Sequence, residues 1–266
     1  MFMVETFIDS GTSKMELILE KILTPSPTGS LKRQRLHDLI RQGMSLGTST
    51  ILSGRAGTGK TVLALDFAAE SGRAVAWYKV DAPDSDMQIF FQYLIASIRT
   101  QRPRFGGESL LSLLHQTTVD NIPLFAEAFV YELEKAIDVS LLVVIDDLHL
   151  VCDAKWLVPF FRRLLPLLPA DVHMLITSRT IPPAPLWRMR SKQTLFVIDE
   201  ETLAFTRAEA VTLFQRHDLS SEQASAAFDH SHGRVATLAT LAANLNFVES
   251  NDGLVRFDLP RRLEAT

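Results

Sequence analysis

One eight-residue motif limits what this 266-residue chain can fold into more than any other feature. Residues 54–61 read GRAGTGKT and match the phosphate-binding pattern G-x-x-x-x-G-K-[ST]. An apolar, strand-like run at 50–52 precedes the motif, and a run with helical spacing at 62–70 follows it. Strand, glycine loop and helix in this order predict a nucleotide site in an α/β fold. A glycine-rich turn before an ordinary helix is the less favoured interpretation.

The residue types of this loop suit phosphate binding. Glycines let backbone N–H groups surround phosphate oxygens, and the N-terminus of the following helix adds partial positive charge. We expect Lys60 to reach the β- and γ-phosphates of ATP and Thr61 to offer its hydroxyl to Mg²⁺. The expected nucleotide-binding residues are Gly54, Arg55, Ala56, Gly57, Thr58, Gly59, Lys60, Thr61 and Val62.

A pair of acids supplies the second half of the expected site. Asp146 and Asp147 directly follow the unbroken apolar run 141–145, which is typical of a strand buried on both faces. P-loop enzymes use one carboxylate to hold Mg²⁺, usually through water, and another to orient the attacking water. We assign Asp146, with Thr61, to the metal and Asp147 to the water. Alone, such a pair is often a solvated loop, but the phosphate loop favours the catalytic interpretation.

A third strand, at 172–176, ends in the polar residues 177–179. In P-loop sheets of this class, that strand lies between the strand before the phosphate loop and the strand before the acids. Arg179 could therefore sense the γ-phosphate and stabilise charge that develops during transfer. With Lys60 and Asp147 it completes the expected catalytic set. A surface arginine at a strand end is the alternative.

Four other chemistry-bearing residues are expected to be structural. His149 lies beside apolar residues, where a lone histidine is usually a hydrogen-bonded structural group. The single cysteine, Cys152, excludes an intrachain disulfide and is interpreted as a packed thiol. Asp81 and Asp84 follow the second strand; contact with the attacking water or a neighbouring subunit is one interpretation, and solvated turn acids fit at least as well.

The alternation of strands and helices along the chain predicts a parallel α/β sheet. Its phosphate loop and acidic pair resemble those of the ASCE/AAA-like P-loop class, a resemblance that implies the strand order 5-1-4-3-2. The expected strands lie at 50–52, 74–80, 141–145, 172–176 and 195–198. Further helices are expected at 32–42, 86–99, 124–137 and 156–165, with a looser region at 100–121.

After residue 200 only helical patterns occur. Two capping boxes, at 206–209 and 220–223, mark helix starts, and a third helix is expected at 235–248 after Gly233. The expected organisation is an extended N-terminal segment (1–30), a P-loop NTPase domain (31–200), a helical lid (201–250) and a polar tail (251–266).

Composition excludes some classes of protein. The net charge is −4, from 27 basic and 31 acidic residues, so no global field attracts nucleic acid. The basic clusters at 32–35, 162–163 and 188–192 are interpreted as solvated faces or as the rim of the nucleotide site, and we do not expect this chain alone to bind duplex DNA directly. No apolar run approaches a membrane span, and the N-terminus lacks the basic end of a signal peptide, so a cytoplasmic protein without a membrane partner is expected.

Taken together, the motifs resemble the nucleotide-binding module of the signal-transduction ATPases with numerous domains (STAND). Within that class they are most similar to the maltose-regulon activator family and the large LuxR-type ATP-dependent transcription regulators, over about residues 28–250. The motifs that carry the resemblance are GRAGTGKT at 54–61, WY at 77–78 with Asp81, FQYLIASI at 91–98, IDDLHL at 145–150, TSR at 177–179 and LAFT at 203–206.

The resemblance has consequences for several residues. It implies that 32–35 packs near the nucleotide base, that Arg179 is the first sensor, and that the helices after Thr206 form a lid whose Gly-x-Pro motif approaches ADP. Here that motif reads Gly233-Arg234-Val235, and valine in place of proline removes a fixed backbone angle. Family regulators continue into winged-helix, helical-repeat and DNA-binding segments, which these 266 residues do not contain.

The expected function is a slowly hydrolysing, Mg²⁺-dependent ATPase that uses the difference between ATP and ADP as a signalling switch. The family also implies assembly of the ATP form into a homo-oligomer or with partner signalling chains, and a link to transcription regulation. Two alternatives stay open. One is a non-catalytic scaffold that holds ADP, and the other is a RecA-like motor, although Asp81 stands where such motors typically have glutamate.

Overall fold

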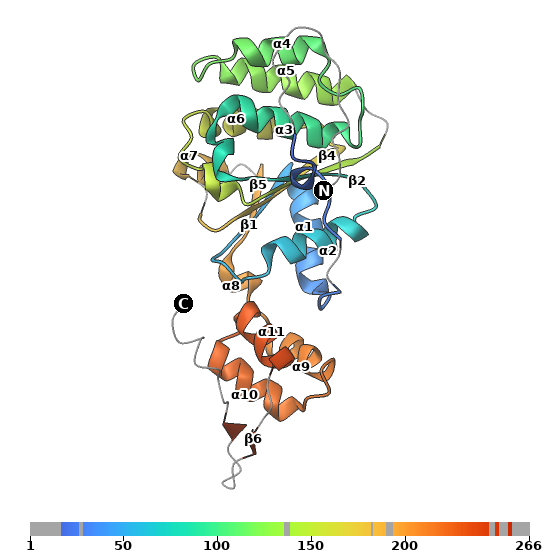
Figure 1. Ribbon diagram of the computed structural model, residues 1–266, viewed down its shortest axis with the longest axis vertical. Helices are drawn as coiled ribbons and strands as arrows, with labels where there is room; N and C mark the ends of the chain where they lie inside the picture. Colours follow the sequence, from blue (N-terminus) through green and yellow to red (C-terminus); the bar gives the residue numbers. More distant parts are fainter. Residues whose placement is uncertain are drawn as a thin grey trace.

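A central five-stranded sheet with helices on both faces forms the larger part of the molecule (Figure 1). The computed structural model describes residues 17–26, 29–135, 139–181, 183–189, 194–244, 248–249 and 255–256. The strands are β1 (Ser49–Ser53), β2 (Ala74–Lys79), β3 (Leu141–Asp146), β4 (Val172–Ser178) and β5 (Leu195–Ile198). All pairings in this sheet are parallel and the order is β2-β3-β4-β1-β5, which confirms the predicted fold class and order.

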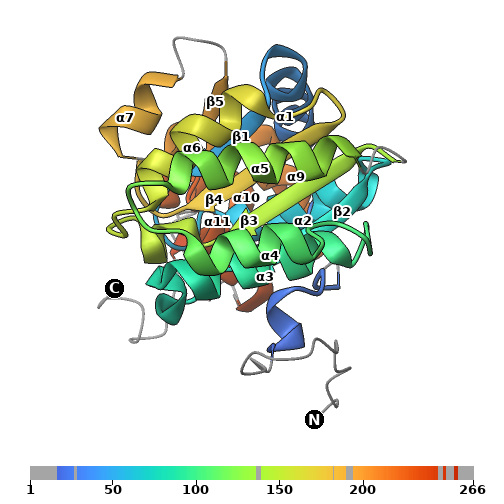
Figure 2. The ribbon, with the colours of Figure 1, turned by 90° about the horizontal axis from the view of Figure 1, so that it is seen from above.

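The two faces of the sheet are covered by different helices, because strand residues alternate between faces. On one face lie α1 (Gln34–Leu46) and α2 (Lys60–Glu70), which share an apolar cluster with Trp77 and Val144. The other face carries an aromatic-rich cluster that includes Tyr78 and Ile145. The helices on that side are α3 (Met87–Arg99), α4 (Glu108–Gln116), α5 (Ile122–Lys135) and α6 (Leu157–Leu164), and Figure 2 shows α4 and α5 in front of the sheet.

Short helices complete the sheet domain. They are η1 (Leu19–Lys21), η2 (Ala82–Ser85), η3 (Leu148–Val151), η4 (Leu165–Leu167) and α7 (Ala184–Trp187). Among the residues that the structure describes, no helix is long and apolar enough to cross a membrane.

Helix α4 corrects the expectation of a loose region at 100–121. The sequence signal for this helix is weak, because the glycines at 106–107 interrupt the helical pattern and only about two turns follow them. Leu110 and Leu114, four residues apart, are both fully buried and belong to the large apolar cluster, so tertiary packing stabilises a helix with a weak local signal.

The N-terminal segment also differs in part from its prediction as an extended segment. Residues 1–16 lie outside the described residues, but η1 brings Lys21 into the protein, where it is only 5% exposed. Its Nζ lies 2.6 Å from both carboxylate oxygens of Asp84, which is 0% exposed, and 4.1 Å from the ring centroid of Tyr93. The interpretation of Asp84 as a solvated turn acid is therefore wrong, whereas the side chain of Asp81 is half-exposed.

The C-terminal helices form a second, smaller layer beyond the sheet domain (Figure 1). They are α8 (Glu200–Leu203), α9 (Arg207–Gln215), α10 (Ser221–Ser231) and α11 (Val235–Asn244). Both predicted capping boxes are confirmed, at Thr206 with Glu209 and at Ser220 with Gln223. Helices α9 to α11 share an apolar cluster separate from those of the sheet. We use the term lid for α8 to α11.

The predicted helix at 235–248 is too long. Helix α11 ends at Asn244, residues 245–247 lie outside the described part, and Val248 begins the short strand β6 (Val248–Glu249). That strand pairs antiparallel with β7 (Val255–Arg256), which falls in the expected polar tail.

Candidate nucleotide site

The phosphate loop connects the end of β1 to the start of α2. Gly57 and Gly59 both have φ of +80°, a left-handed conformation that glycine adopts without strain. Helix α2 begins at Lys60, so Thr61 and Val62 lie in its first turn, where backbone N–H groups have no partner within the helix. The geometry provides the donors that an anion requires.

Lys60 is folded into this loop and is 7% exposed. Its Nζ donates to the carbonyl oxygens of Gly54 at 2.6 Å and Arg55 at 2.9 Å. Burial lowers the pKa of Lys60, while the negative charge of Asp147 opposes that shift and the positive charge of Arg179 adds to it. The charges of Asp147 and Arg179 therefore lie close enough to Lys60 to affect its ammonium group.

The two residues expected to hold the metal lie against each other. The Thr61 hydroxyl donates a hydrogen bond to Oδ1 of Asp146 at 2.9 Å, and Asp146 is 2% exposed. Burial raises the pKa of Asp146, and hydrogen bonds from Thr177 and Thr61 oppose this shift. A carboxylate and a hydroxyl beside a phosphate loop suit Mg²⁺, which prefers oxygen ligands and keeps several waters. In the described ranges no cluster of three or more His, Cys, Asp or Glu could hold a metal by itself.

Asp147 has an unusual backbone conformation for a residue other than glycine, with φ of 61°. Its backbone N–H donates to Thr177 Oγ1 at 2.9 Å. Its Oδ1 lies 3.6 Å from Nδ1 of His149, whose side chain is 11% exposed. Burial lowers the pKa of His149, and the negative charge of Asp147 opposes that shift.

Arg179 follows β4 directly and is exposed. Its charge lowers the pKa of both Lys60 and His149, so the guanidinium lies on the same edge of the sheet as the loop and the acids. Strand β4 lies between β1 and β3, as predicted, because Leu52 pairs with Thr177 and Ile145 with Ile176. All residues of the expected catalytic set therefore share the carboxyl edge of the sheet.

Glu200, the first residue of α8, is a rim residue that sequence reasoning missed. Its Oε2 accepts from the backbone N–H of Arg55 at 2.9 Å, and its Oε1 accepts from the Arg55 side chain at 2.8 Å. These hydrogen bonds lower the pKa of Glu200. The two residues are 145 positions apart, and no local pattern signals their contact.

The lid contacts the phosphate loop directly. The backbone N–H of Ala236, in the first turn of α11, donates to the carbonyl oxygen of Gly57 at 2.9 Å. A Cβ at Gly59 would lie 3.2 Å from Cγ1 of Val235. Val235, which stands in the place of the family proline, therefore lies beside the loop. Gly233 has φ of +77° and lies so close to Phe205 that a Cβ there would be 2.6 Å from its carbonyl oxygen.

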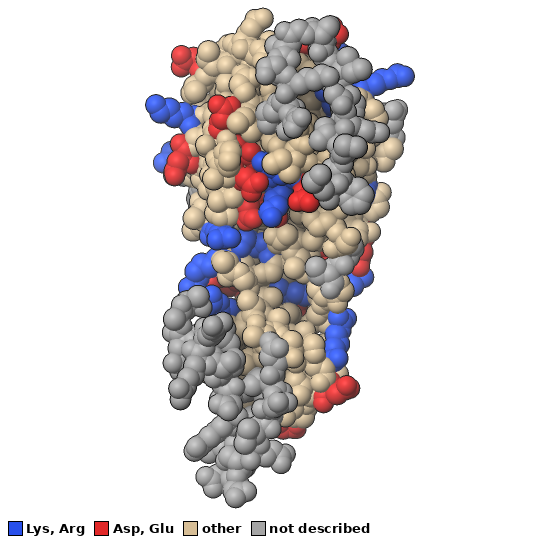
Figure 3. All heavy atoms as spheres, in the orientation of Figure 1, with Lys and Arg blue, Asp and Glu red and all other residues tan. Residues whose placement is uncertain are grey.

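Two arginines at the start of α1 join the lid to the sheet domain. Arg33 is 7% exposed and donates to the carbonyl oxygen of Ala204 at 2.8 Å, and Arg35 donates to that of Thr202 at 2.9 Å. Both guanidinium groups also lie within 3.4 Å of a carboxylate oxygen of Glu209. Figure 3 shows basic side chains where the lid meets the sheet domain. The interpretation of this cluster as a solvated face is wrong for Arg33.

The basic cluster at 162–163 is peripheral. Arg163 forms an ion pair with Glu127 at 2.6 Å, away from the loop. Arg190 and Lys192 lie outside the described residues.

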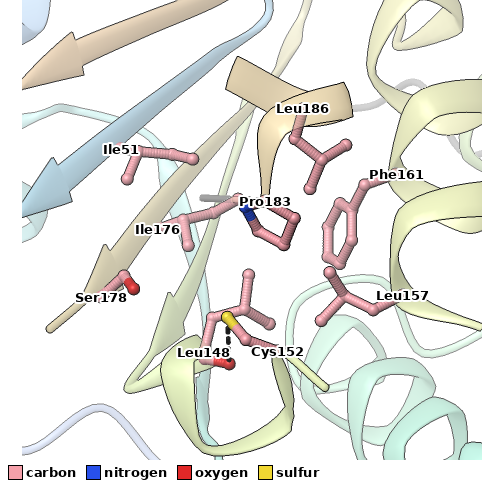
Figure 4. A pocket seen from close by; sticks show the side chains of 9 residues that line it. All are labelled: Ile51, Leu148, Cys152, Leu157, Phe161, Ile176, Ser178, Pro183 and Leu186. Atoms are coloured by element: carbon pink, nitrogen blue, oxygen red, sulfur yellow. Dashed lines mark hydrogen bonds between the residues drawn. The ribbon is translucent and has the colours of Figure 1, made fainter. Parts of the chain in front are cut away.

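A small apolar pocket lies among the strand ends, α6 and the segment before α7 (Figure 4). Ile51, Leu148, Phe161 and Leu186 are among the residues that line it. Its volume of about 10 Å³ is roughly that of one water molecule. Cys152 is half-buried at the wall of this pocket, its Sγ donates to the carbonyl oxygen of Leu148 at 3.6 Å, and burial raises the pKa of the thiol.

Comparison with known proteins agrees with this architecture. MalT of Yersinia pestis (strain Pestoides F), named as an HTH-type transcriptional regulator, is 30% identical over 197 residues, which cover 73% of this chain. PknK of Mycobacterium tuberculosis (strain CDC 1551 / Oshkosh), named as a serine/threonine-protein kinase, is 32% identical over 194 residues, or 70% of this chain. The matched region spans only 21% of MalT and 17% of PknK. No family model matches the chain.

The solved structures support the fold. The Walker-type ATPase PABY2304 of Pyrococcus abyssi aligns with a TM-score of 0.52 and 13% identity, over 80% of this chain and 67% of that one. The sequence relatives, the all-parallel sheet order and the phosphate loop agree with one another. The chain is a STAND-like P-loop ATPase module, related in sequence to the corresponding regions of MalT and PknK.

Proposed function

We propose that this chain binds ATP with Mg²⁺, hydrolyses it slowly and uses the difference between ATP and ADP as a conformational switch. The observation that carries the proposal is the 2.9 Å contact between Thr61 and Asp146. It joins the phosphate loop to the acidic pair at the edge of the sheet where parallel α/β proteins bind ligands.

Each site residue has a role in this proposal. Lys60 and the N–H groups at the start of α2 bind the β- and γ-phosphates, and Thr61 and Asp146 hold Mg²⁺, which when bound offsets phosphate charge. Asp147 orients the attacking water, and Arg179 stabilises charge on the transferred group. Arg55, Ala56 and the loop glycines complete the phosphate cradle.

The lid provides the element that responds to the nucleotide. Ala236 is hydrogen-bonded to Gly57 within the phosphate loop, and Glu200 pairs with Arg55 at the start of that loop. A ligand shifts a conformational equilibrium only by contacts that differ between two states. A γ-phosphate seated among residues that also hold the lid would provide such a difference.

ATP titration and steady-state turnover of three variants test this proposal. Lys60→Ala removes a charge-assisted phosphate contact worth about 1.5–3 kcal/mol, so ATP affinity should fall roughly 10- to 100-fold. Asp147→Asn should retain ATP affinity and lower turnover. The control is Lys135→Ala, which removes an exposed lysine of α5 that pairs with Glu132. Wild-type binding and turnover in both site variants would contradict the site assignment.

The contact between the lid and the loop also favours a second candidate, a scaffold that holds ADP without turnover. A lid seated on the phosphate loop would retain a bound diphosphate. This candidate requires ADP to be released from freshly purified protein on denaturation, and turnover no higher than that of Lys60→Ala. The motor alternative is tested by whether single-stranded DNA stimulates turnover. Asp81, which stands where such motors typically have glutamate, has its carboxylate 3.6 Å from Lys21 Nζ.

The output of the switch is inferred from the relatives alone. MalT and PknK are named for different outputs, transcription regulation and protein phosphorylation, and this chain spans about a fifth of their lengths. We infer that it supplies a nucleotide-dependent regulatory step, through an ATP-dependent homo-oligomer or partner signalling chains. A mass measurement that shows a monomer with both ATP and ADP would remove the homo-oligomer.

A further inference from the structure

The hydroxyl of Thr177 lies between the two acids of the site. Thr177 is the next-to-last residue of β4 and is 0% exposed. Its Oγ1 donates to Asp146 Oδ1 at 2.6 Å and accepts from the backbone N–H of Asp147 at 2.9 Å. One side chain from a neighbouring strand therefore contacts both members of the acidic pair.

The strand register explains this placement. Ile176 of β4 pairs with Ile145 of β3, so the next residues, Thr177 and Asp146, stand level at the carboxyl edge. On its other side β4 pairs with β1, where Thr177 lies opposite Leu52. Thr177 is thus fixed by the centre of the sheet, which is a rigid support for a site.

A hydroxyl can make both contacts with a single atom. It has one donor and also accepts, and here it donates to a carboxylate while it accepts from an N–H group. Asp147 needs such an anchor because its φ of 61° lies in a region that residues other than glycine rarely adopt. Asp146 is already contacted by Thr61, so Thr177 fixes its carboxylate from a second direction.

We propose that Thr177 is a positioning residue whose hydroxyl holds Asp146 for the metal and Asp147 for the attacking water at the same time. The inference rests on the proposed function, because the roles of Asp146 and Asp147 are the ones proposed in that subsection. Partners that orient metal-binding groups typically change metal affinity or activity 10- to 100-fold when they are removed. Both hydrogen bonds of the hydroxyl go to the acidic pair, so ATP affinity without Mg²⁺ stays unchanged.

The experiment compares Thr177→Val, which keeps the shape, Thr177→Ala, a second hydroxyl-free variant, and Thr177→Ser, which keeps the hydroxyl. Two quantities are measured: the gain in ATP affinity when Mg²⁺ is added, and kcat and KM for ATP. The valine and alanine variants should reduce the Mg²⁺ gain about 10-fold and kcat about 10- to 100-fold, and serine should restore both to within about 3-fold of wild type.

The matched control is Thr50→Val, which removes a fully buried hydroxyl from the adjacent strand β1. The Thr50 hydroxyl is hydrogen-bonded to Nε2 of His173 at 3.0 Å, whereas the Thr177 hydroxyl is hydrogen-bonded to the acidic pair. Thr50→Val should leave the Mg²⁺ gain and kcat unchanged, even though it lowers stability.

The outcomes separate this inference from the proposed function. A wild-type Mg²⁺ gain and kcat in both hydroxyl-free variants, or a serine variant as impaired as valine, overturns the role of Thr177. If wild-type protein binds ATP with a Mg²⁺ gain but does not turn it over, the proposed hydrolysis fails, and the Mg²⁺ gain of the variants still decides the metal half of the inference. Wild-type protein that binds no ATP overturns both.

Discussion

Gly57→Ala tests whether the lid is seated on the phosphate loop, because an added Cβ would lie 2.8 Å from the Cβ of Ala236. The left-handed conformation, with φ of +80°, costs a residue other than glycine about 1–2 kcal/mol. Both residues are exposed, so α11 can shift, and the close contact should add only about 1 kcal/mol, at the low end for overpacking. Without nucleotide, Gly57→Ala should lower the free energy of unfolding by about 2–3 kcal/mol.

A double-mutant cycle separates the backbone strain from the lid contact. Ala236→Gly removes the partner Cβ, so Gly57→Ala in that background should cost only the strain, and the coupling energy between the two sites should be about 1 kcal/mol. Urea unfolding of the four proteins gives this energy. The control is Gly72→Ala, since Gly72 has φ of +67° and a Cβ there would meet nothing within 4 Å. Its cost should be the same in both backgrounds. A coupling energy of zero for Gly57 and Ala236 would refute the seated lid.

Two further predictions concern buried charge. Burial, with a smaller contribution from Arg73, lowers the pKa of His173 from 6.5 to about 4. As the pH falls, the unfolded chain therefore binds this proton before the folded protein does. Between pH 6.5 and about 4 the free energy of unfolding should decrease by about 3 kcal/mol. In a series of urea-unfolding measurements over this pH range, His173→Gln should remove most of that decrease. Lys21→Met leaves the Asp84 carboxylate buried without its cation and should cost about 3–5 kcal/mol in thermal or urea unfolding. Lys135→Met breaks only an exposed pair and should change stability by less than about 1 kcal/mol, so equal costs would argue against a buried Lys21–Asp84 pair.

Elements whose sequence signal lies in neighbouring residues could be predicted, and elements that depend on distant contacts could not. Buried strands such as 141–145, long apolar faces and capping boxes are encoded by neighbouring residues, and the structure confirms them. Helix α4 has only a weak local signal, because Leu110 and Leu114 stabilise it through contacts with the large cluster of the sheet domain. No local pattern predicts the burial of Lys21, because its partner, Asp84, is 63 residues away.

The sequence by itself determined the fold class, the strand order through the class of its phosphate loop, and the candidates Lys60, Thr61 and Asp146. These follow from short runs in which the spacing of residue types is set by backbone geometry. Only the tertiary structure decided what supports them. Thr177 meets the acidic pair, and Ala236 meets Gly57, because parallel crossovers and the return of the lid bring distant segments to one edge of the sheet. Such contacts depend on how whole elements pack, and no local residue pattern encodes them.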